Sequence, residues 1–335
     1  MNRNTGIDIL RIVSCFMVVC IHTCLNYQYG LESLNNTLAL VGQSLFRIGL
    51  PVFFMLSGYF ILNSKVDFSV ESLYFRIKKI IIPFIFFSMV HWFIINKEMV
   101  LSFAGMIDYI YALTVRNSIS MHFWFVYSLI GLYLFSQPIN YLLKNISEKG
   151  AFCGLILIAF LFLYNGDLPS VSNVLPVPYI DKWTAYFIAG GLLFRIRDKI
   201  SFIQAGILSI IGYISIMILS VYNSGHHYPM PYDFSISMFA ACSGVVLFFS
   251  KINAANDYFL SKLSTSTYGA YLIHICVLKI ISPLYFDYIH LPGIFNYFIS
   301  TLAVAAIVFI ISMAISFLFT PIIDVFVSMK TKKTL

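Results

Sequence analysis

The chain has 335 residues, of which 60% are hydrophobic and 10% charged, and its formal net charge is +7. A soluble domain has about 25% charged residues, so this composition excludes an ordinary soluble protein. Backbone in lipid must satisfy its own hydrogen bonds, and the sequence lacks the alternating pattern of a membrane β-barrel. We therefore predict an all-α polytopic membrane protein with one domain, residues 1–335.

Apolar stretches recur along the whole chain. A helix that crosses a bilayer needs about 20 apolar residues. The ten predicted spans cover residues 6–27, 44–63, 76–95, 121–142, 151–165, 183–196, 203–222, 234–250, 264–285 and 296–323. The fifth and sixth of them are short. A weakly apolar segment, residues 101–113, is broken by Asp108 and predicts a re-entrant or interfacial piece.

Basic residues are divided unevenly between alternate loops. Most lie before the first span, after the even-numbered spans or at the end of the chain, whereas the opposite loops hold only Lys97, Arg116 and Lys182. Under the positive-inside rule, this distribution places both termini in the cytoplasm. It also explains the net charge as a topology signal, so we expect no nucleic acid partner.

The first span carries three ionisable side chains, Asp8, Arg11 and His22. On an α-helix, Arg11 and His22 share a face about 16 Å apart, and Asp8 lies one turn before Arg11 and can pair with it. Charged groups inside a bilayer usually face a protein interior or a water-filled cavity, which indicates function. The alternatives are that Arg11 snorkels to the headgroups at the cytoplasmic edge and that His22 is a packing residue.

Three later spans hold further candidates. Arg47 lies near the outer end of the second span, and the run Ser57-Gly58-Tyr59 lies near its inner end. Gly58 permits close approach of another backbone. The fourth span opens with His122 at the outer face, and the ninth places Tyr271 and His274 one turn apart near mid-membrane. No cysteine pair or histidine group has the spacing of a metal site, so we expect no metal.

Four of these motifs resemble the acyltransferase-three family of bacterial membrane proteins, which includes the O-antigen acetylases. They are Arg11 and His22 with ten residues between them, the run from Phe53 to Tyr59, the opening His122-Phe-Trp124-Phe, and Gly269-Ala-Tyr271-Leu-Ile-His274. They stand in the family's order, and the resemblance covers essentially the whole chain. In the family's pattern, Arg11 and His22 correspond to the essential pair.

The resemblance implies a ten-helix enzyme of the bacterial inner membrane. Such an enzyme takes an acyl group, commonly acetyl from cytosolic acetyl-CoA, and delivers it to a hydroxyl of a surface glycan or its lipid-linked precursor on the outer side. The sequence gives no sign of the extra esterase-like domain that some members carry, so we expect the transfer to be completed within the membrane domain.

The residue chemistry agrees with this implication. We expect neutral His22 to remove the proton of the sugar hydroxyl as it attacks the thioester, with a covalent acetyl-imidazole as the less favoured route. Arg11 is expected to hold a CoA phosphate or the thioester region. The remaining catalytic candidates, which orient His22 or stabilise the oxyanion, are Arg47, His122, Tyr271 and His274.

Acetyl-CoA is the expected acyl donor. Its candidate contacts are Arg11 and residues at the inner ends of the second and third spans: Ser57, Gly58, Tyr59, Arg76 and Lys78. The acceptor is expected to be O-antigen or its precursor, with common antigen, peptidoglycan or a periplasmic glucan as alternatives and succinyl as an alternative acyl group. A transporter for a lipid-linked sugar is the rival from another class, but the sequence shows no inverted repeat.

Overall fold

The computed structural model describes residues 4–24, 34–64, 69–95, 102–116, 118–168, 180–252, 258–288 and 301–328. Within these ranges all regular structure is helical, which confirms the predicted all-α class. The helices are α1 (Thr5–Thr23), α2 (Leu34–Phe46), α3 (Gly49–Ile61), α4 (Val70–Ile95), α5 (Phe103–Tyr111), α6 (Trp124–Leu143), α7 (Glu148–Phe162), α9 (Lys182–Ile196), α10 (Phe202–His226), α11 (Ile236–Ser250), α12 (Tyr258–Tyr288) and α13 (Thr301–Ser328). Short helical turns occupy η1 (Ala112–Arg116), η2 (Met121–Phe123), η3 (Leu163–Asp167) and η4 (Arg197–Lys199).

Each of the ten predicted spans contains a helix. Among the described residues, the helices that are long and apolar enough to cross a bilayer are Thr5–Thr23, Asn36–Ile61, Val70–Ile94, Glu148–Asp167, Phe202–His226 and Thr301–Ser328. One more is obtained if Phe103–Arg116 and Met121–Leu143, bent by 53°, form one broken span. The protein is therefore a multi-pass membrane protein, while the number ten and the cytoplasmic termini stay predictions.

The second span begins earlier than predicted, because α2 and α3 together form one apolar rod from residue 36 rather than 44. The sequence pattern missed this start because Asn36, Gln43 and Ser44 are polar, although all three are buried in the protein. The Ser44 hydroxyl donates to the carbonyl oxygen of Leu40 at 2.8 Å, so its polarity costs little inside the bundle. Residues 25–27 and 296–300 of the predicted spans lie outside the described part.

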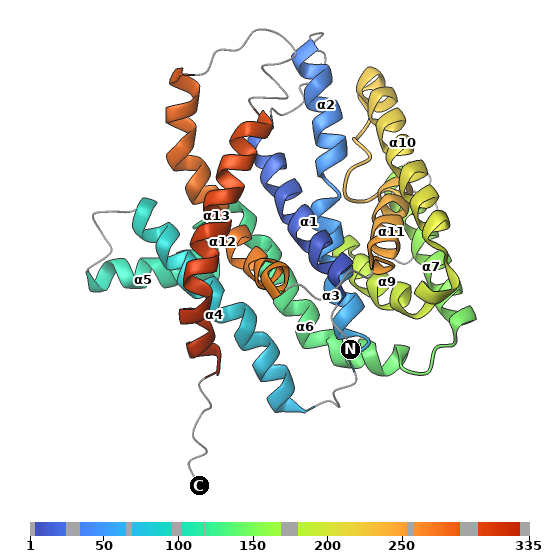
Figure 1. Cartoon of the computed structure of the whole chain (residues 1–335), viewed down its shortest axis with the longest axis horizontal. Helices are drawn as coiled ribbons and strands as arrows, with labels where there is room; N and C mark the ends of the chain where they lie inside the picture. The colour runs from blue at the N-terminus through green and yellow to red at the C-terminus, as the bar shows by residue number, and fades with distance from the viewer. Residues whose placement is uncertain are drawn as a thin grey trace.

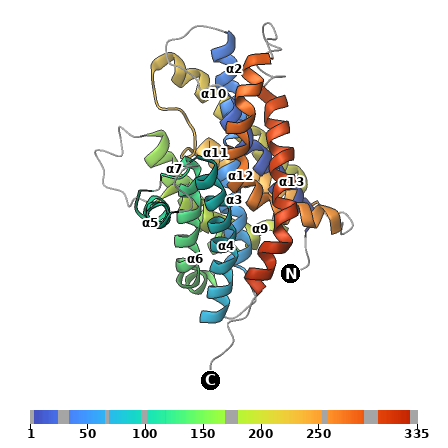
Figure 2. The same ribbon diagram turned by 90° about the vertical axis from the view of Figure 1, so that its left-hand side faces the viewer.

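Helix α1 runs through the middle of the bundle, against α3, α11, α12 and α13 (Figures 1 and 2). Its first turn is fixed to the end of α11. The Asn4 side chain accepts a hydrogen bond from the Ile7 amide at 3.0 Å and donates to the Ser250 carbonyl at 2.8 Å. A Cβ on Gly6 would come within 2.0 Å of the Phe249 carbonyl oxygen, so only glycine allows this contact. The charged face of α1 is thereby held in the interior.

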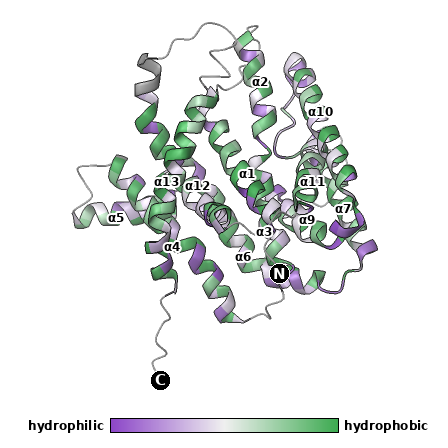
Figure 3. Cartoon of the chain, in the orientation of Figure 1, coloured by the Kyte–Doolittle hydropathy of each residue, from purple (hydrophilic) through white to green (hydrophobic). Residues whose placement is uncertain are grey.

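Helices α3 and α9 cross at close range because each presents a glycine to the other's backbone. A Cβ on Gly58 would lie 1.7 Å from the Phe187 carbonyl oxygen, and one on Gly190 would lie 1.8 Å from that of Met55. The predicted close approach at Gly58 is confirmed. By contrast, α10 and α13 are apolar along most of their length (Figure 3), and their exposed Ile and Leu side chains suit a lipid-facing surface.

Candidate active site

Histidines from separate helices gather at the centre of the bundle: His22 on α1, His91 on α4, His122 on η2 and His274 on α12. The ring centres of His22 and His274 lie 5.2 Å apart, those of His274 and His122 4.8 Å, and those of His122 and His91 5.6 Å. Tyr271 joins the cluster at 5.3 Å from His122 and 5.6 Å from His274. The structure therefore brings together the predicted residues His22, His122, Tyr271 and His274.

The backbone of α12 organises this histidine cluster. The Leu272 carbonyl oxygen accepts from Nε2 of His91 at 2.8 Å and from Nε2 of His122 at 3.2 Å. A carbonyl only accepts, so Nδ1 of His122 is the bare nitrogen and accepts from the Ser120 hydroxyl at 2.8 Å. The Tyr271 hydroxyl donates to the His122 carbonyl oxygen at 2.7 Å. These bonds fix the rings of His91 and His122, which are almost fully buried.

His91 is a member of the cluster that the sequence analysis missed. The sequence analysis gave residues 76–95 as a span without singling out His91, whose neighbours are apolar and aromatic. Only 1% of the residue is exposed, and its hydrogen bond reaches across to α12. A lone histidine in an apolar span was the available signal, because polar side chains in such positions usually face the bundle interior.

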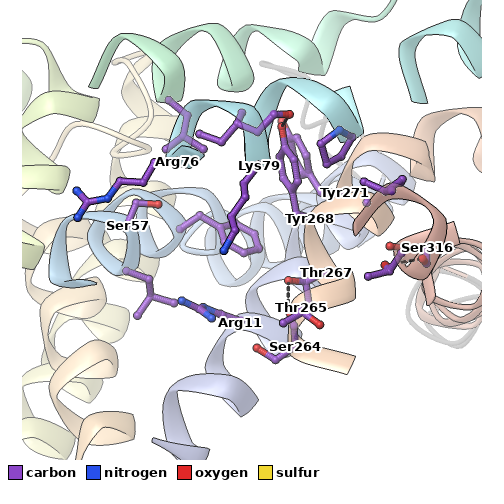
Figure 4. A pocket seen from close by; sticks show the side chains of 18 of the residues that line it. Arg11, Ser57, Arg76, Lys79, Ser264, Thr265, Thr267, Tyr268, Tyr271 and Ser316 are labelled. Carbon is purple, nitrogen blue, oxygen red and sulfur yellow. Dashed lines mark hydrogen bonds between the residues drawn. The ribbon is translucent and has the colours of Figure 1, made fainter. Parts of the chain in front are cut away.

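A cavity of about 650 Å³ lies beside this cluster, between α1, α3, α4, α6, α12 and α13. Its basic wall consists of Arg11, Arg76 and Lys79, and Figure 4 shows Arg11 and Lys79 reaching toward the same space from α1 and α4. The remaining polar lining residues are Ser57, Ser64, Ser264, Thr265, Thr267, Tyr268, Tyr271, Ser316, Thr320 and Asp324. Phe53, Phe60, Phe87 and Phe125 provide apolar surface. The cavity thus combines cations, hydroxyls and aromatic rings.

Arg11 enters the cavity wall with its predicted partner. Nη1 of Arg11 lies 3.8 Å from Oδ1 of Asp8, and the Ser264 hydroxyl donates to the same oxygen at 2.7 Å. The guanidinium also lies over the Phe60 ring, 4.8 Å from its centre. Asp8 is buried, whereas Arg11 lines the open space. The Asp8 to Arg11 pair is confirmed, and its place on a cavity favours function over a simple edge anchor.

The predicted cofactor contacts divide by helix face. Ser57 and Arg76 line the cavity, and Arg76 also donates to the Ser64 hydroxyl at 3.1 Å. Gly58 and Tyr59 face α9 instead, where the Tyr59 ring packs on Phe194 at 4.9 Å. Successive helical residues point about 100° apart, so neighbours of a lining residue turn away from the cavity.

The same rotation separates two neighbouring lysines of α4. Lys79 lines the cavity and was not predicted. Lys78, which was predicted, is not among the lining residues and lies 5.9 Å from the centre of the Tyr74 ring. The predicted basic segment therefore reaches the cavity through Arg76 and Lys79, and the role of Lys78 as a cofactor contact stays a prediction.

Arg47 lies in a separate ion cluster with Asp233 and Lys182. Its Nη1 is 3.6 Å from Oδ2 of Asp233, to which Lys182 also pairs at 3.4 Å. Its Nε donates to Oε1 of Gln43 at 3.2 Å, and its guanidinium lies over the Tyr232 ring. Arg47 does not line the cavity. These contacts favour a structural tie, and its predicted catalytic role stays a prediction.

Tyr271 connects the cavity with the histidine cluster. It lines the cavity, where its ring packs on Phe125 at 4.9 Å and Phe53 at 6.5 Å, and its far side contacts His122 and His274. In the part of the chain that the structure describes, no three His, Cys, Asp or Glu side chains are arranged to hold a metal. The arrangement can therefore bind an anionic ligand beside a buried set of imidazoles.

One known protein family matches nearly all of the helices described above. The family described as an acyltransferase domain matches residues 4–320. Neither a curated protein nor a solved structure matches the chain. The matched region includes every residue of the cavity except Asp324, Ile323 and Val327, and all of the histidine cluster. The chain belongs to the acyltransferase-three family, and it is a membrane acyltransferase.

Proposed function

We propose that the protein transfers an acetyl group from acetyl-CoA to a sugar hydroxyl of O-antigen, or of its lipid-linked precursor, at the outer face of the bacterial inner membrane. The observation that carries the proposal is the continuity between the basic cavity and the histidine cluster through Tyr271. A donor held in the cavity would end beside the imidazoles. The family match supplies the class of reaction, which is acyl transfer.

The cavity suits a CoA thioester. Arg11, Arg76 and Lys79 offer the charge-assisted hydrogen bonds that phosphates favour. The hydroxyls and phenyl rings that also line the cavity match an arm that alternates amide and methylene groups. The cavity volume of about 650 Å³ lies within the range of roughly 300–1,000 Å³ that ligand pockets occupy. Arg11 and His22 are about 16 Å apart along α1, so one helix contacts both ends of such a ligand.

His22 is the general base in this proposal. Its bare ring nitrogen removes the proton of the sugar hydroxyl as the oxygen bonds to the acyl carbon. The carbon to sulfur bond then breaks, and His22 returns the proton to the departing thiolate. His22 is suited to this role because it is only half-buried, whereas the other members of the cluster are closed off. His122 and Tyr271 hold each other through a hydrogen bond and shape the site around it.

The acceptor and the acyl group set the alternatives. Another envelope glycan, such as common antigen, peptidoglycan or a periplasmic glucan, would use the same base and cavity, as would a succinyl donor. A transporter for a lipid-linked sugar is disfavoured by the family match, which extends over nearly the whole chain. O-antigen is proposed first because the chain resembles the O-antigen acetylases in size and layout.

Acetyl transfer to lipopolysaccharide tests the proposal. Membranes that contain the wild-type protein, His22→Ala or His226→Ala would receive labelled acetyl-CoA, with label in the polysaccharide normalised to protein level. His226 is an exposed histidine at the end of α10 and serves as the matched control. We expect label with the wild type and His226→Ala and none with His22→Ala. If intact wild-type protein gives no label, the proposed acyl acceptor or acyl donor is wrong. If His22→Ala gives as much label as the wild type, the proposed role of His22 is wrong.

A further inference from the structure

One buried ring nitrogen of His274 has no role in the reaction proposed above. The side chain is fully buried, and its Nδ1 is hydrogen-bonded to the Tyr271 carbonyl oxygen. Because a carbonyl only accepts, Nδ1 carries the hydrogen. Its Nε2 has no hydrogen-bond partner among the described residues, although nearly all buried polar atoms in proteins have one. The geometry therefore leaves one specific atom of His274 to be explained.

The charge state of His274 follows from its surroundings. Among the described residues, no carboxylate lies within ion-pair distance of it, and its neighbours are the imidazoles of His22 and His122 and the phenol of Tyr271. A buried charge without a counter-ion is strongly disfavoured, so His274 is neutral. With the hydrogen on Nδ1, Nε2 is a bare lone pair. This atom requires a donor.

His22 is the neighbour that can supply the donor. His122 cannot, because its Nε2–H is given to the Leu272 carbonyl and its Nδ1 accepts from Ser120. Two imidazoles joined by an N–H···N bond of about 2.9 Å have ring centres roughly 5 Å apart. The observed separation of His22 and His274 is 5.2 Å, so a rotation of the half-buried His22 ring is enough to form the bond.

We propose that His274 is the positioning residue for His22. His274 accepts a hydrogen bond from the N–H of one His22 nitrogen. This bond selects the His22 tautomer whose other nitrogen is bare and faces the sugar hydroxyl. This inference rests on the proposed role of His22 as general base and adds the residue that orients it. When His22 takes the proton from the sugar hydroxyl, the same hydrogen bond becomes charge-assisted and holds the imidazolium in place until the thiolate accepts the proton.

Two substitutions at position 274 separate this role from simple packing. In His274→Gln, the amide oxygen occupies the place of Nε2 and can still accept from His22. In His274→Asn, the amide occupies the place of Nδ1, so the contact with the Tyr271 carbonyl is retained and the acceptor for His22 is lost. We expect His274→Asn to lower kcat for acetyl transfer at least tenfold more than His274→Gln, with KM for acetyl-CoA unchanged in both.

The control variant is Cys276→Ala, two residues along α12 from His274. Cys276 is also buried, but successive helical residues point about 100° apart, so its side chain lies on another face of the helix. We expect it to keep the wild-type kcat per folded molecule. Equal kcat for His274→Asn and His274→Gln, or a loss in Cys276→Ala as large as in His274→Asn, would overturn the inference.

A spectroscopic measurement tests the proposed hydrogen bond between His22 and His274 without any enzymatic turnover. Nitrogen NMR of the purified full chain with ¹⁵N-labelled histidine distinguishes a protonated from a bare ring nitrogen, and the His22 signals are those missing in His22→Gln. We expect a single His22 tautomer in the wild type and in His274→Gln and a mixture in His274→Asn. The same mixture in all three would overturn the inference. If acetyl transfer fails with the wild type, the proposed function fails, while the tautomer result still decides the pairing.

Discussion

The basic cavity and the histidine cluster lie side by side but are built on opposite principles. The cavity is open and lined by cations and hydroxyls that a ligand can reach. The cluster is closed except at half-buried His22, and the imidazoles of His91, His122 and His274 are hydrogen-bonded to backbone carbonyls of α12. Tyr271 lines the cavity and also contacts the histidine cluster. The difference indicates that this acyltransferase divides binding from chemistry, so substitutions in the two regions should have different kinetic signatures.

Arg11→Ala is expected to have the largest effect within the cavity. The change removes a cation from the wall and leaves buried Asp8 without its guanidinium partner. We expect kcat/KM for acetyl-CoA to fall about 100-fold or more, since a hydrogen bond to a charged group contributes about 1.5–3 kcal/mol and the buried carboxylate is also destabilised. Steady-state kinetics in membranes measure it. A variant that is folded and fully active would show that Arg11 is only an edge anchor.

Arg76→Ala and Lys78→Ala form a matched pair on α4. Both remove one positive charge from the same segment, but Arg76 lines the cavity and Lys78 is not among its lining residues. We expect KM for acetyl-CoA to rise about tenfold in Arg76→Ala, because one charge-assisted contact is lost, and to change less than twofold in Lys78→Ala. Equal effects would mean that the overall charge of the inner loops, rather than the cavity, attracts the donor.

Gly58→Ala and Gly131→Ala compare a packed glycine with an open one. A Cβ at Gly58 would meet the Phe187 carbonyl oxygen, whereas no atom lies within 4 Å of one at Gly131 among the described residues. We expect Gly58→Ala to lower the free energy of unfolding by about 1–3 kcal/mol and Gly131→Ala to stay within about 1 kcal/mol of wild type. Thermal unfolding in detergent measures both. Equal Tm values would show that α3 and α9 pack less tightly than described.

Arg47→Gln is expected to have the smallest effect. Arg47 is tied to Asp233 and Gln43 away from the cavity, and about a third of its side chain is exposed. A partly exposed ion pair contributes about 0–1 kcal/mol, so we expect a small decrease in Tm and an unchanged KM for acetyl-CoA. A large loss of kcat at normal protein level would instead support the predicted catalytic role of Arg47.

Much of the fold could be predicted from the sequence because apolar periodicity reports directly on helices that face lipid. The charged face of α1 was also predictable, since Asp8 and Arg11 are one turn apart and pair as expected. The start of α2 was not, because Ser44 looks polar until its partner Ser220 on α10 is known. A pattern along one helix cannot show which polar residues another helix satisfies.

The site was predictable where residues share a motif and not where tertiary contacts select them. His22, His122, Tyr271 and His274 belong to motifs, and the structure brings them together. His91 belongs to no such motif and joins the cluster through the Leu272 carbonyl and the neighbouring His122 ring. Lys79 rather than Lys78 lines the cavity because the rotation of α4 is set by its packing, which the basic segment alone does not reveal.

Binding of labelled acetyl-CoA to purified His22→Gln tests most directly whether binding and chemistry are separate. His22 lies in the histidine cluster and does not line the cavity, so the variant leaves the basic wall intact. We expect Kd to equal that of the wild type while acetyl transfer falls by about 10²–10⁴-fold, the usual contribution of a general base. A folded His22→Gln protein that loses acetyl-CoA binding together with transfer would contradict it.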